Sequence, residues 1–173
     1  MFNRKCKITF IAHGATIHSE ENRVSDKENY PPLNEAGEQE IEKICEWLKK
    51  RAIKNDVIYS SPALRTIQSA QMVAKVFKKD FEIVDDLHFL KKNEDVMDFS
   101  KRIVKIIKKI VEDNIGNRII IVTHPEVIQS AISSAIKLPV KNQKNIYIKT
   151  GSASQISYYE NWASLVYSGY IPL

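Results

Sequence analysis

Short apolar segments alternate with longer amphipathic ones along most of the chain, and this alternation restricts the fold more than any other feature of the sequence. We expect strands over four segments, Lys7 to Ala12, Asp56 to Ser60, Phe81 to Val84 and Arg118 to Thr123. We expect helices over Leu33 to Lys50, Pro62 to Phe77, Val96 to Asp113 and Pro125 to Ile136. Strands separated by helices of this kind are typical of a parallel sheet with helices on both faces.

The most apolar of the expected strands is Arg118 to Thr123, which favours a central position covered on both faces. After Pro139 the helices give way to short segments with strand character, at Ile146 to Lys149, Ser154 to Tyr159 and Ser164 to Tyr167. We therefore expect an α/β fold of three α/β/α layers, with a mostly parallel central sheet and an antiparallel C-terminal edge. No linker divides the 173 residues, so we expect a single domain over residues 1–173.

The chain is basic, with 26 Lys and Arg against 21 Asp and Glu and a net charge of +5. This charge admits an anionic partner without naming one. The densest basic group lies on the expected helix from Val96 to Asp113, at Lys101, Arg102, Lys105, Lys108 and Lys109. These residues alternate with apolar ones at helical spacing, which indicates a solvated outer face. No aromatic residues are interleaved with them, so we expect no nucleic-acid partner.

The apolar run from Ile8 to Ala12 is too short for a membrane span or for the core of a signal peptide. Cys6 and Cys45 fall in an expected strand and an expected helix without metal-ligand spacing, as buried reduced thiols do. We therefore expect a cytoplasmic protein with no membrane partner. The sequence leaves the oligomeric state open.

Two of the 4 histidines directly follow expected strands. His13 follows the first strand and precedes Gly14, and His124 follows the most apolar strand and opens a helix. Ser60, Ser61 and Arg65 lie at the end of the second strand and in the first turn of its helix. Because the carboxyl ends of parallel strands meet at one edge of a sheet, these groups are expected to form one site. Arginine and helix N-termini favour phosphate, and a neutral imidazole can attack phosphorus.

Two other chemistries have little support in the sequence. His13 and His18 are five residues apart in a loop without a carboxylate or cysteine cluster, so we expect no metal. A serine hydrolase would need a Gly-x-Ser-x-Gly turn, which is absent. The polar segment from Gly14 to Pro32 has the length of a functional lid, although an idle surface loop fits equally well.

Four segments together resemble one known family. The sequence Phe-Ile-Ala-His-Gly-Ala-Thr at 10–16 resembles the Arg-His-Gly-x-Thr opening of the histidine phosphatase superfamily, the phosphoglycerate mutase-like proteins. Leu33 to Gln39 is similar to the family's Leu-Thr-x-x-Gly-x-x-Gln helix start. Ile58 to Ala70 is similar to its Ser-Ser-x-x-x-Arg-x-x-Gln-Thr-Ala block, and Ile120 to His124 resembles the strand that bears its second histidine. The resemblance covers about residues 7 to 136 and implies a phosphoglycerate mutase-like fold.

The resemblance also implies a mechanism that needs no metal or cofactor. His13 would be the nucleophile and would form a phosphohistidine that water then hydrolyses. Arg65 and His124 would join it as catalytic residues and, with Gly14 and Thr16, would bind the phosphoryl group. The substrate would be a phosphorylated small molecule or a phosphoprotein, and the short chain favours the small phosphatases over a glycolytic mutase. A carboxylic acid after the third strand would protonate the leaving oxygen.

The chain departs from the family pattern at two positions. Ala12 stands where the family has the arginine before the nucleophile, and Phe89 aligns with the usual glutamate. The candidates for a replacement proton donor are Asp86 and Glu94, with His88 and Glu126 as further options, and Arg23 or Lys27 are the candidates for the missing cation. The site is therefore expected to be weakened. The alternative is a catalytically degenerate member that binds a phosphorylated ligand or serves as an interaction scaffold, with the basic helix as a further docking candidate.

Overall fold

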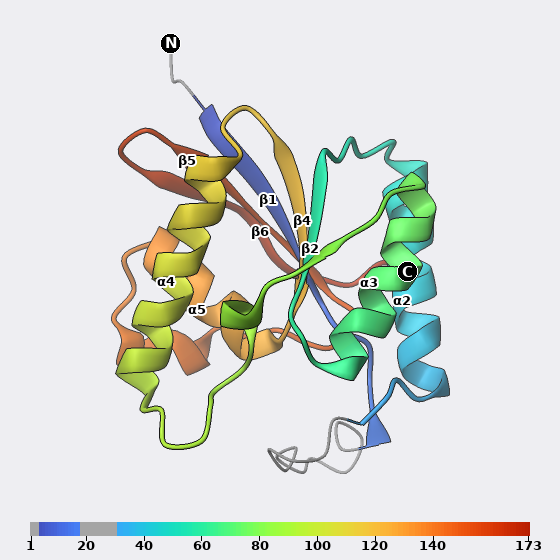
Figure 1. Ribbon diagram of the computed structural model, residues 1–173, viewed down its shortest axis with the longest axis horizontal. Coiled ribbons are helices and arrows are strands. Elements are labelled where there is room, and N and C mark those ends of the chain that lie inside the picture. Colours follow the sequence, from blue (N-terminus) through green and yellow to red (C-terminus); the bar gives the residue numbers. More distant parts are fainter. Residues whose placement is uncertain (1–3, 18–30) are drawn as a thin grey trace.

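The computed structural model describes residues 4–17 and 31–173 and shows a mixed sheet between two pairs of helices (Figure 1). The strands are β1 (Arg4–Ala12), β2 (Val57–Ser60), β3 (Glu82–Ile83), β4 (Arg118–Thr123), β5 (Ala153–Tyr159) and β6 (Ala163–Tyr170). The helices are α2 (Glu35–Lys50), α3 (Leu64–Phe77), α4 (Val96–Asp113) and α5 (Pro125–Ala135), with two short 3-10 helices, η1 (Asp85–Leu87) and η2 (Val140–Asn145).

The sheet has the order β3-β2-β4-β1-β5-β6. β3, β2, β4 and β1 are mutually parallel, whereas β5 and β6 add an antiparallel edge. Each parallel connection passes through a helix, so that α2 and α3 cover one face and α4 and α5 cover the other (Figure 1). The expected three-layer α/β fold with an antiparallel C-terminal edge is therefore confirmed.

β4 is buried on both faces, as its sequence predicts. Ile119 and Ile121 belong to the apolar core beneath α4 and α5, whereas Ile120 and Val122 belong to the core beneath α2 and α3. Because successive side chains of a strand point to opposite faces, a continuous apolar run fits only a strand with helices on both sides.

Local sequence signals fix the helix starts. The Asn34 side chain accepts a hydrogen bond from the Gly37 amide over 2.8 Å, so α2 begins at Glu35 and not at Leu33. Asp95 caps α4 in the same way, through the Asp98 amide. Caps of this kind satisfy amides that have no partner within the first turn.

One expected strand is wrong. The segment Ile146 to Lys149 follows η2 and does not pair into the sheet. The carbonyl of Ile146 accepts a hydrogen bond of 2.7 Å from the side chain of Gln129 on α5. The alternation of buried Ile148 with exposed Tyr147 thus arises from packing and not from strand pairing.

Some sequence-based expectations lie outside the described residues, namely those for His18, Arg23, Lys27 and most of the segment from Gly14 to Pro32. Cys6 and Cys45 are both buried and not bonded to each other. Within residues 4–17 and 31–173, no helix is long and apolar enough to cross a membrane.

Candidate active site

The two histidines that follow strands lie side by side. β1 and β4 pair in parallel with Ala12 opposite Thr123, so the next residue of each strand is an imidazole. The His13 amide donates to the Thr123 carbonyl over 3.0 Å, and the His13 and His124 ring centroids are 5.3 Å apart. The Gly151 amide donates to the His13 carbonyl, which ties the turn before β5 to the same place.

The hydrogen bonds of His13 fix its tautomer. Its Nδ1 lies 2.8 Å from the carbonyl oxygen of Gly14, and its Nε2 accepts from Nε of Arg65 over 3.1 Å. Since guanidinium only donates, Nε2 carries the lone pair and Nδ1 carries the proton. Burial, reinforced by the positive charge of Arg65, lowers the pKa of His13 to about 3. The imidazole is therefore neutral near pH 7, with its lone pair towards Arg65.

Arg65 joins both imidazoles from the first turn of α3. Its Nη2 lies 3.3 Å from Nδ1 of His124, whose Nε2 lies 2.7 Å from the Ser61 hydroxyl oxygen. His124 therefore accepts from the arginine and donates to the serine. Burial is the main cause that lowers the pKa of His124 well below its usual value, and the charge of Arg65 adds to it. The expected grouping of His13, Arg65, His124 and Ser61 is present.

The loop after His13 runs against the start of α2. A Cβ atom on Gly14 would overlap the Gly37 carbonyl, and one on Gly37 would overlap the backbone of Ala15. The Gly14 amide donates to the Ser69 hydroxyl over 3.3 Å, and the Ala15 amide donates to the Glu40 carboxylate over 2.9 Å. Both glycines are thus required by close backbone approach.

Thr16 is buried, and its expected part in phosphate binding stays a prediction. Ala12 is also fully buried, in the apolar core beneath α4 and α5.

The rings of Phe89 and His88 lie against His124, and we call these two rings the cover of the site. The Phe89 ring lies 5.0 Å from that of His124, and the Arg65 guanidinium carbon lies 5.1 Å from the centre of Phe89. His88 packs on Phe89 at 4.2 Å and lies 6.0 Å from His124. A phenyl ring therefore occupies the place over Arg65, where a carboxylate would otherwise be attracted. His13 and Arg65 are each 5% exposed and His124 is fully buried.

Arg102 of α4 holds this cover in place, which corrects the expectation of a solvated side chain. Its guanidinium donates to the carbonyls of Asp86, His88 and Phe89 over 2.6 to 3.3 Å. It also forms two hydrogen bonds of 2.7 Å with the Glu94 carboxylate, and both side chains are only 13% exposed. The helical spacing correctly predicted the face of α4, but not the segment that packs beside Arg102.

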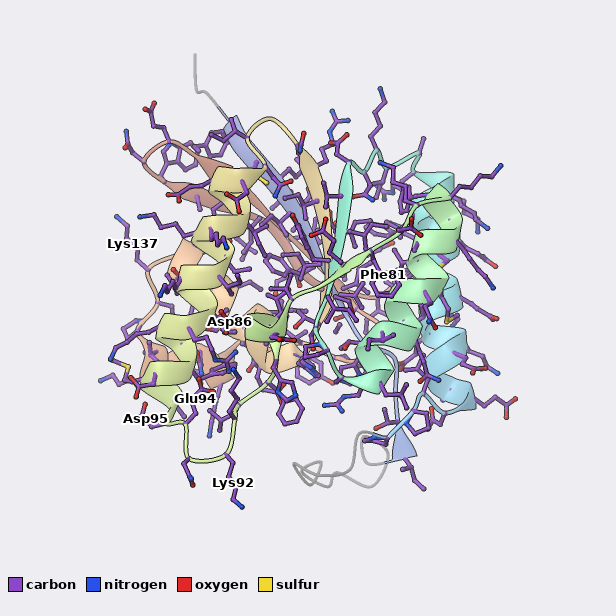
Figure 2. All side chains as sticks on the ribbon, viewed as in Figure 1. Phe81, Asp86, Lys92, Glu94, Asp95 and Lys137 are labelled. Atoms are coloured by element: carbon purple, nitrogen blue, oxygen red, sulfur yellow. The ribbon has the colours of Figure 1, made fainter. Side chains whose placement is uncertain are left out.

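The expected carboxylates have partners other than the imidazoles, or are exposed. Figure 2 shows Asp86 on η1 and Glu94 just before α4. Asp86 is exposed and lies 3.9 Å from the Lys91 ammonium. The hydrogen bonds from Arg102 lower the pKa of Glu94, which keeps its carboxylate ionised. Glu126 is exposed on the first turn of α5. None of the three is linked to His13 or His124 by the hydrogen bonds and ion pairs among the described residues.

The described part of the chain holds no group of three or more His, Cys, Asp and Glu side chains suited to a metal ion. The polar groups that converge are two imidazoles, a guanidinium and a hydroxyl, and they suit an oxyanion better than a cation.

Comparison with known proteins agrees with this chemistry. A family model of the histidine phosphatase superfamily (branch 1) matches residues 8–90 and 88–169. No curated protein matches the sequence.

Solved structures share the fold at low sequence identity. A phosphoserine phosphatase from Entamoeba histolytica has 15% identity and a TM-score of 0.84, with 95% of this chain and 96% of that chain covered. The alpha-ribazole phosphatase from Shigella flexneri has 18% identity and a TM-score of 0.82, with 95% and 96% covered. A mycobacterial glucosyl-3-phosphoglycerate phosphatase has 16% identity and a TM-score of 0.77, with 93% and 97% covered.

Proposed function

Because this chain belongs to the histidine phosphatase superfamily, we propose that it is a metal-independent phosphatase that hydrolyses a phosphomonoester or a phosphoprotein through a phosphohistidine. The single observation that carries the proposal is that one guanidinium, Arg65, contacts the lone pairs of two neutral imidazoles, His13 and His124. Structurally similar proteins include phosphatases of phosphoserine, alpha-ribazole phosphate and glucosyl-3-phosphoglycerate, three chemically different phosphomonoesters.

The first chemical step is attack by His13. Its Nδ1–H donates to the Gly14 carbonyl, so Nε2 carries the lone pair that forms the bond to phosphorus. The bond between phosphorus and the substrate oxygen breaks, and that oxygen takes up a proton. Arg65 moves its Nε–H from Nε2 to a phosphoryl oxygen, where it stabilises the developing charge. Water then attacks phosphorus, which releases inorganic phosphate and regenerates His13.

His124 must change its protonation state to assist. Its Nδ1 accepts from Arg65 in this structure, so it offers a lone pair and not a proton to the site. Binding of a phosphoryl dianion favours the imidazolium, which can donate from Nδ1 to a phosphoryl oxygen while Nε2 donates to Ser61. Substrate binding is thus coupled to the uptake of one proton.

The proton for the leaving oxygen is best assigned to His88. Its ring is 6.0 Å from that of His124, whereas the Glu94 carboxylate is held by Arg102 and Asp86 is exposed near Lys91. Burial is the main cause that lowers the pKa of His88. The acid form is therefore a minority near pH 7, and the enzyme is slow there.

The second candidate function is binding of a phosphorylated ligand without turnover. Two observations favour it: Ala12 lies fully buried in an apolar core where a phosphate-binding arginine is absent, and the Phe89 ring lies over Arg65. Removal of one such donor typically lowers a rate by about 10²–10³. Loss of a general acid typically costs about 10²–10⁴.

The test is a panel of phosphomonoesters and phosphopeptides at pH 5 and pH 7, followed by trapping of phosphohistidine with an alkaline denaturing quench, in which the P–N bond survives. We expect slow turnover, faster at pH 5, that disappears in His13→Ala. Lys105→Gln removes an exposed charge on α4 and is the matched control, which should retain full activity. Phosphate binding without turnover in the natural protein would select the degenerate binder. Activity that survives in His13→Ala would refute the mechanism.

A further inference from the structure

A cavity lies away from the active site, at the opposite end of the strands that carry the histidines. It has a volume of about 430 Å³ and lies among the starts of β1 and β4, the segment after α2, and β5 and β6. We call it the basal cavity. Lys7 pairs with Arg118 at this end of the sheet, whereas Ala12 pairs with Thr123 beside the active site. Five strand steps separate the two ends, which is roughly 17 Å.

The sheet surface changes character in the basal cavity. Nearer the active site, the face under α2 carries Ile11, Val122 and Ala153, all buried in the apolar core. On the same face, two residues further from the active site on β1 and on the antiparallel β5, lie Thr9 and Gln155, whose side chains are hydrogen-bonded to each other at 3.0 Å. Beyond the end of α2 the sheet therefore presents the polar pair Thr9 and Gln155, which we call the floor of the cavity. Apolar side chains at these two positions would satisfy core packing equally well.

Four cations surround this floor: Lys7, Arg51, Lys54 and Arg118 all line the cavity. Arg51 and Lys54 are exposed and the other two are half-buried. In the part of the chain that the structure describes, no carboxylate lines the cavity. Asp56, two residues after Lys54, is not a lining residue, and its carboxylate accepts a hydrogen bond of 2.7 Å from the Arg118 amide. A recess with one sign of charge concentrates ligands of the opposite sign.

The remaining wall is aromatic. Trp47 of α2 and Tyr167 of β6 meet edge to face, with ring centroids 6.2 Å apart. The indole Nε1 of Trp47 is buried and has no hydrogen-bond acceptor among the described residues. Burial raises the pKa of the Tyr167 hydroxyl to about 12, with Thr9 and Arg51 opposing the shift. Two aromatic side chains beside a set of cations favour an anionic ligand that also has a π-system.

We propose that the basal cavity binds a small anion that carries a planar ring, of the class of a mononucleotide. The ring would pack against Trp47 and Tyr167, and the phosphate would lie among Arg51, Lys54 and Arg118. The volume lies in the range of small-ligand sites. This site is independent of the proposed phosphatase reaction, because it shares no side chain with His13, Arg65 or His124.

The test uses Trp47 as the reporter. The chain has 2 tryptophans, so Trp162→Phe leaves Trp47 as the only indole. AMP, GMP, CMP, UMP and inorganic phosphate are titrated against this protein and followed by fluorescence, with calorimetry on the unaltered chain. We expect saturable quenching by at least one mononucleotide and weaker binding of phosphate alone.

Three variants locate the bound nucleotide. Arg118→Gln and Lys54→Gln should each weaken binding, Arg118→Gln by about tenfold or more. Lys105→Gln, at an exposed position on α4, should leave it unchanged. Arg65→Ala disables the phosphate pocket of the active site and should not weaken this binding. The reverse pattern, with loss in Arg65→Ala and none in Arg118→Gln, assigns the nucleotide to the active site and overturns the proposal. The proposal is also overturned if none of the four mononucleotides binds saturably.

Discussion

Arg65 donates its Nε–H to Nε2 of His13 over 3.1 Å, so the nitrogen with the reactive lone pair is already in contact with the guanidinium. The same guanidinium reaches Nδ1 of His124 at 3.3 Å. One side chain therefore orients both imidazoles, and its charge adds to the burial that keeps the pKa of each one low. A phosphoryl group that enters this site replaces two imidazole–guanidinium contacts with contacts between opposite charges.

Loss of Arg65 should change the titration of His13. The pKa of His13 is lowered first by burial and then by the charge of Arg65. In Arg65→Ala the second cause is absent, so the pKa should rise from about 3 towards its ordinary value while kcat/KM falls by roughly 10²-fold or more. NMR titration of the imidazole signals measures the shift. Arg65→Lys keeps the charge and should show a smaller rise. An unchanged pKa in Arg65→Ala would show that the guanidinium does not act on His13.

The rate should depend on pH through His13, His88 and His124. His124 takes up a proton when the phosphoryl group binds, which adds to a rise at low pH in every variant that keeps it. His13 must be neutral to attack, and its low pKa keeps it so down to about pH 3. His88 must be protonated to donate, and its pKa lies below the ordinary value. We therefore expect kcat/KM to rise as the pH falls from 7 to 5. His88→Gln should flatten this rise. A profile of His88→Gln with the same shape as that of the natural protein would exclude His88 as the donor.

A carboxyl group at position 89 should restore activity near pH 7. Phe89 lies over Arg65 and beside His124, which is where a proton donor for the leaving oxygen belongs. Phe89→Glu should raise kcat at pH 7 by roughly 10²-fold, within the usual range for a general acid, because the bound phosphoryl dianion offsets the charge of Arg65 and favours a protonated carboxyl group. Phe89→Gln removes the ring without supplying an acid and is the matched control. Equal rates in the two variants would mean that opening the cover, and not proton donation, causes the gain.

The contact between the backbones of Gly14 and Gly37 should make Gly37→Ala costly. The new methyl group would overlap the Ala15 backbone, so the loop that carries His13 must move away from α2. We expect a loss of about 1–3 kcal/mol in the free energy of unfolding and a lower kcat/KM. Urea denaturation measures the first. Glu38→Ala alters the exposed neighbour and should do little. Stability equal to that of the natural protein would show that the loop tolerates the shift.

Acid should destabilise the fold through its neutral histidines. His13 and His124 resist protonation when folded, but each binds a proton near pH 6.5 when unfolded. The unfolded state then holds more protons, so the free energy of unfolding falls as the pH drops from 6.5 to 5, by up to about 1.4 kcal/mol per pH unit for each histidine.

Carboxylates contribute little above pH 5, which isolates the histidine effect. Chemical denaturation across this range should give a shallower slope for His13→Gln than for the natural protein. Identical slopes would show that His13 binds a proton in the folded state.

The sequence predicts the main site because each chemical group is tied to a regular element. His13 and His124 directly follow strands, and Arg65 lies in the first turn of a helix, so parallel pairing alone brings them together. Arg102 could not be predicted in the same way. Its partners are backbone carbonyls of residues 86, 88 and 89, and the path of that segment depends on packing that no local pattern encodes.

Two other features also depend on tertiary packing and not on a local pattern. The short run from Ile146 to Lys149 has strand-like alternation, but only the fold reveals that Gln129 takes the carbonyl a strand partner would need. The basal cavity had a visible signal, since Lys7 and Thr9 occupy positions of β1 that face the same side as buried Ile11. That signal becomes meaningful only once α2 is known to end above it.

The paired parts of β1 and β4 have the same number of residues. This equality determines which mutations leave the two imidazoles side by side. Six pairs run from Lys7 opposite Arg118 to Ala12 opposite Thr123. Substitutions within these segments do not change the number of residue pairs. The deletion or insertion of one residue in either strand separates the imidazoles and moves the remaining side chains of that strand to the opposite face of the sheet. Relatives of this chain should therefore differ freely in side chains here while conserving the spacing.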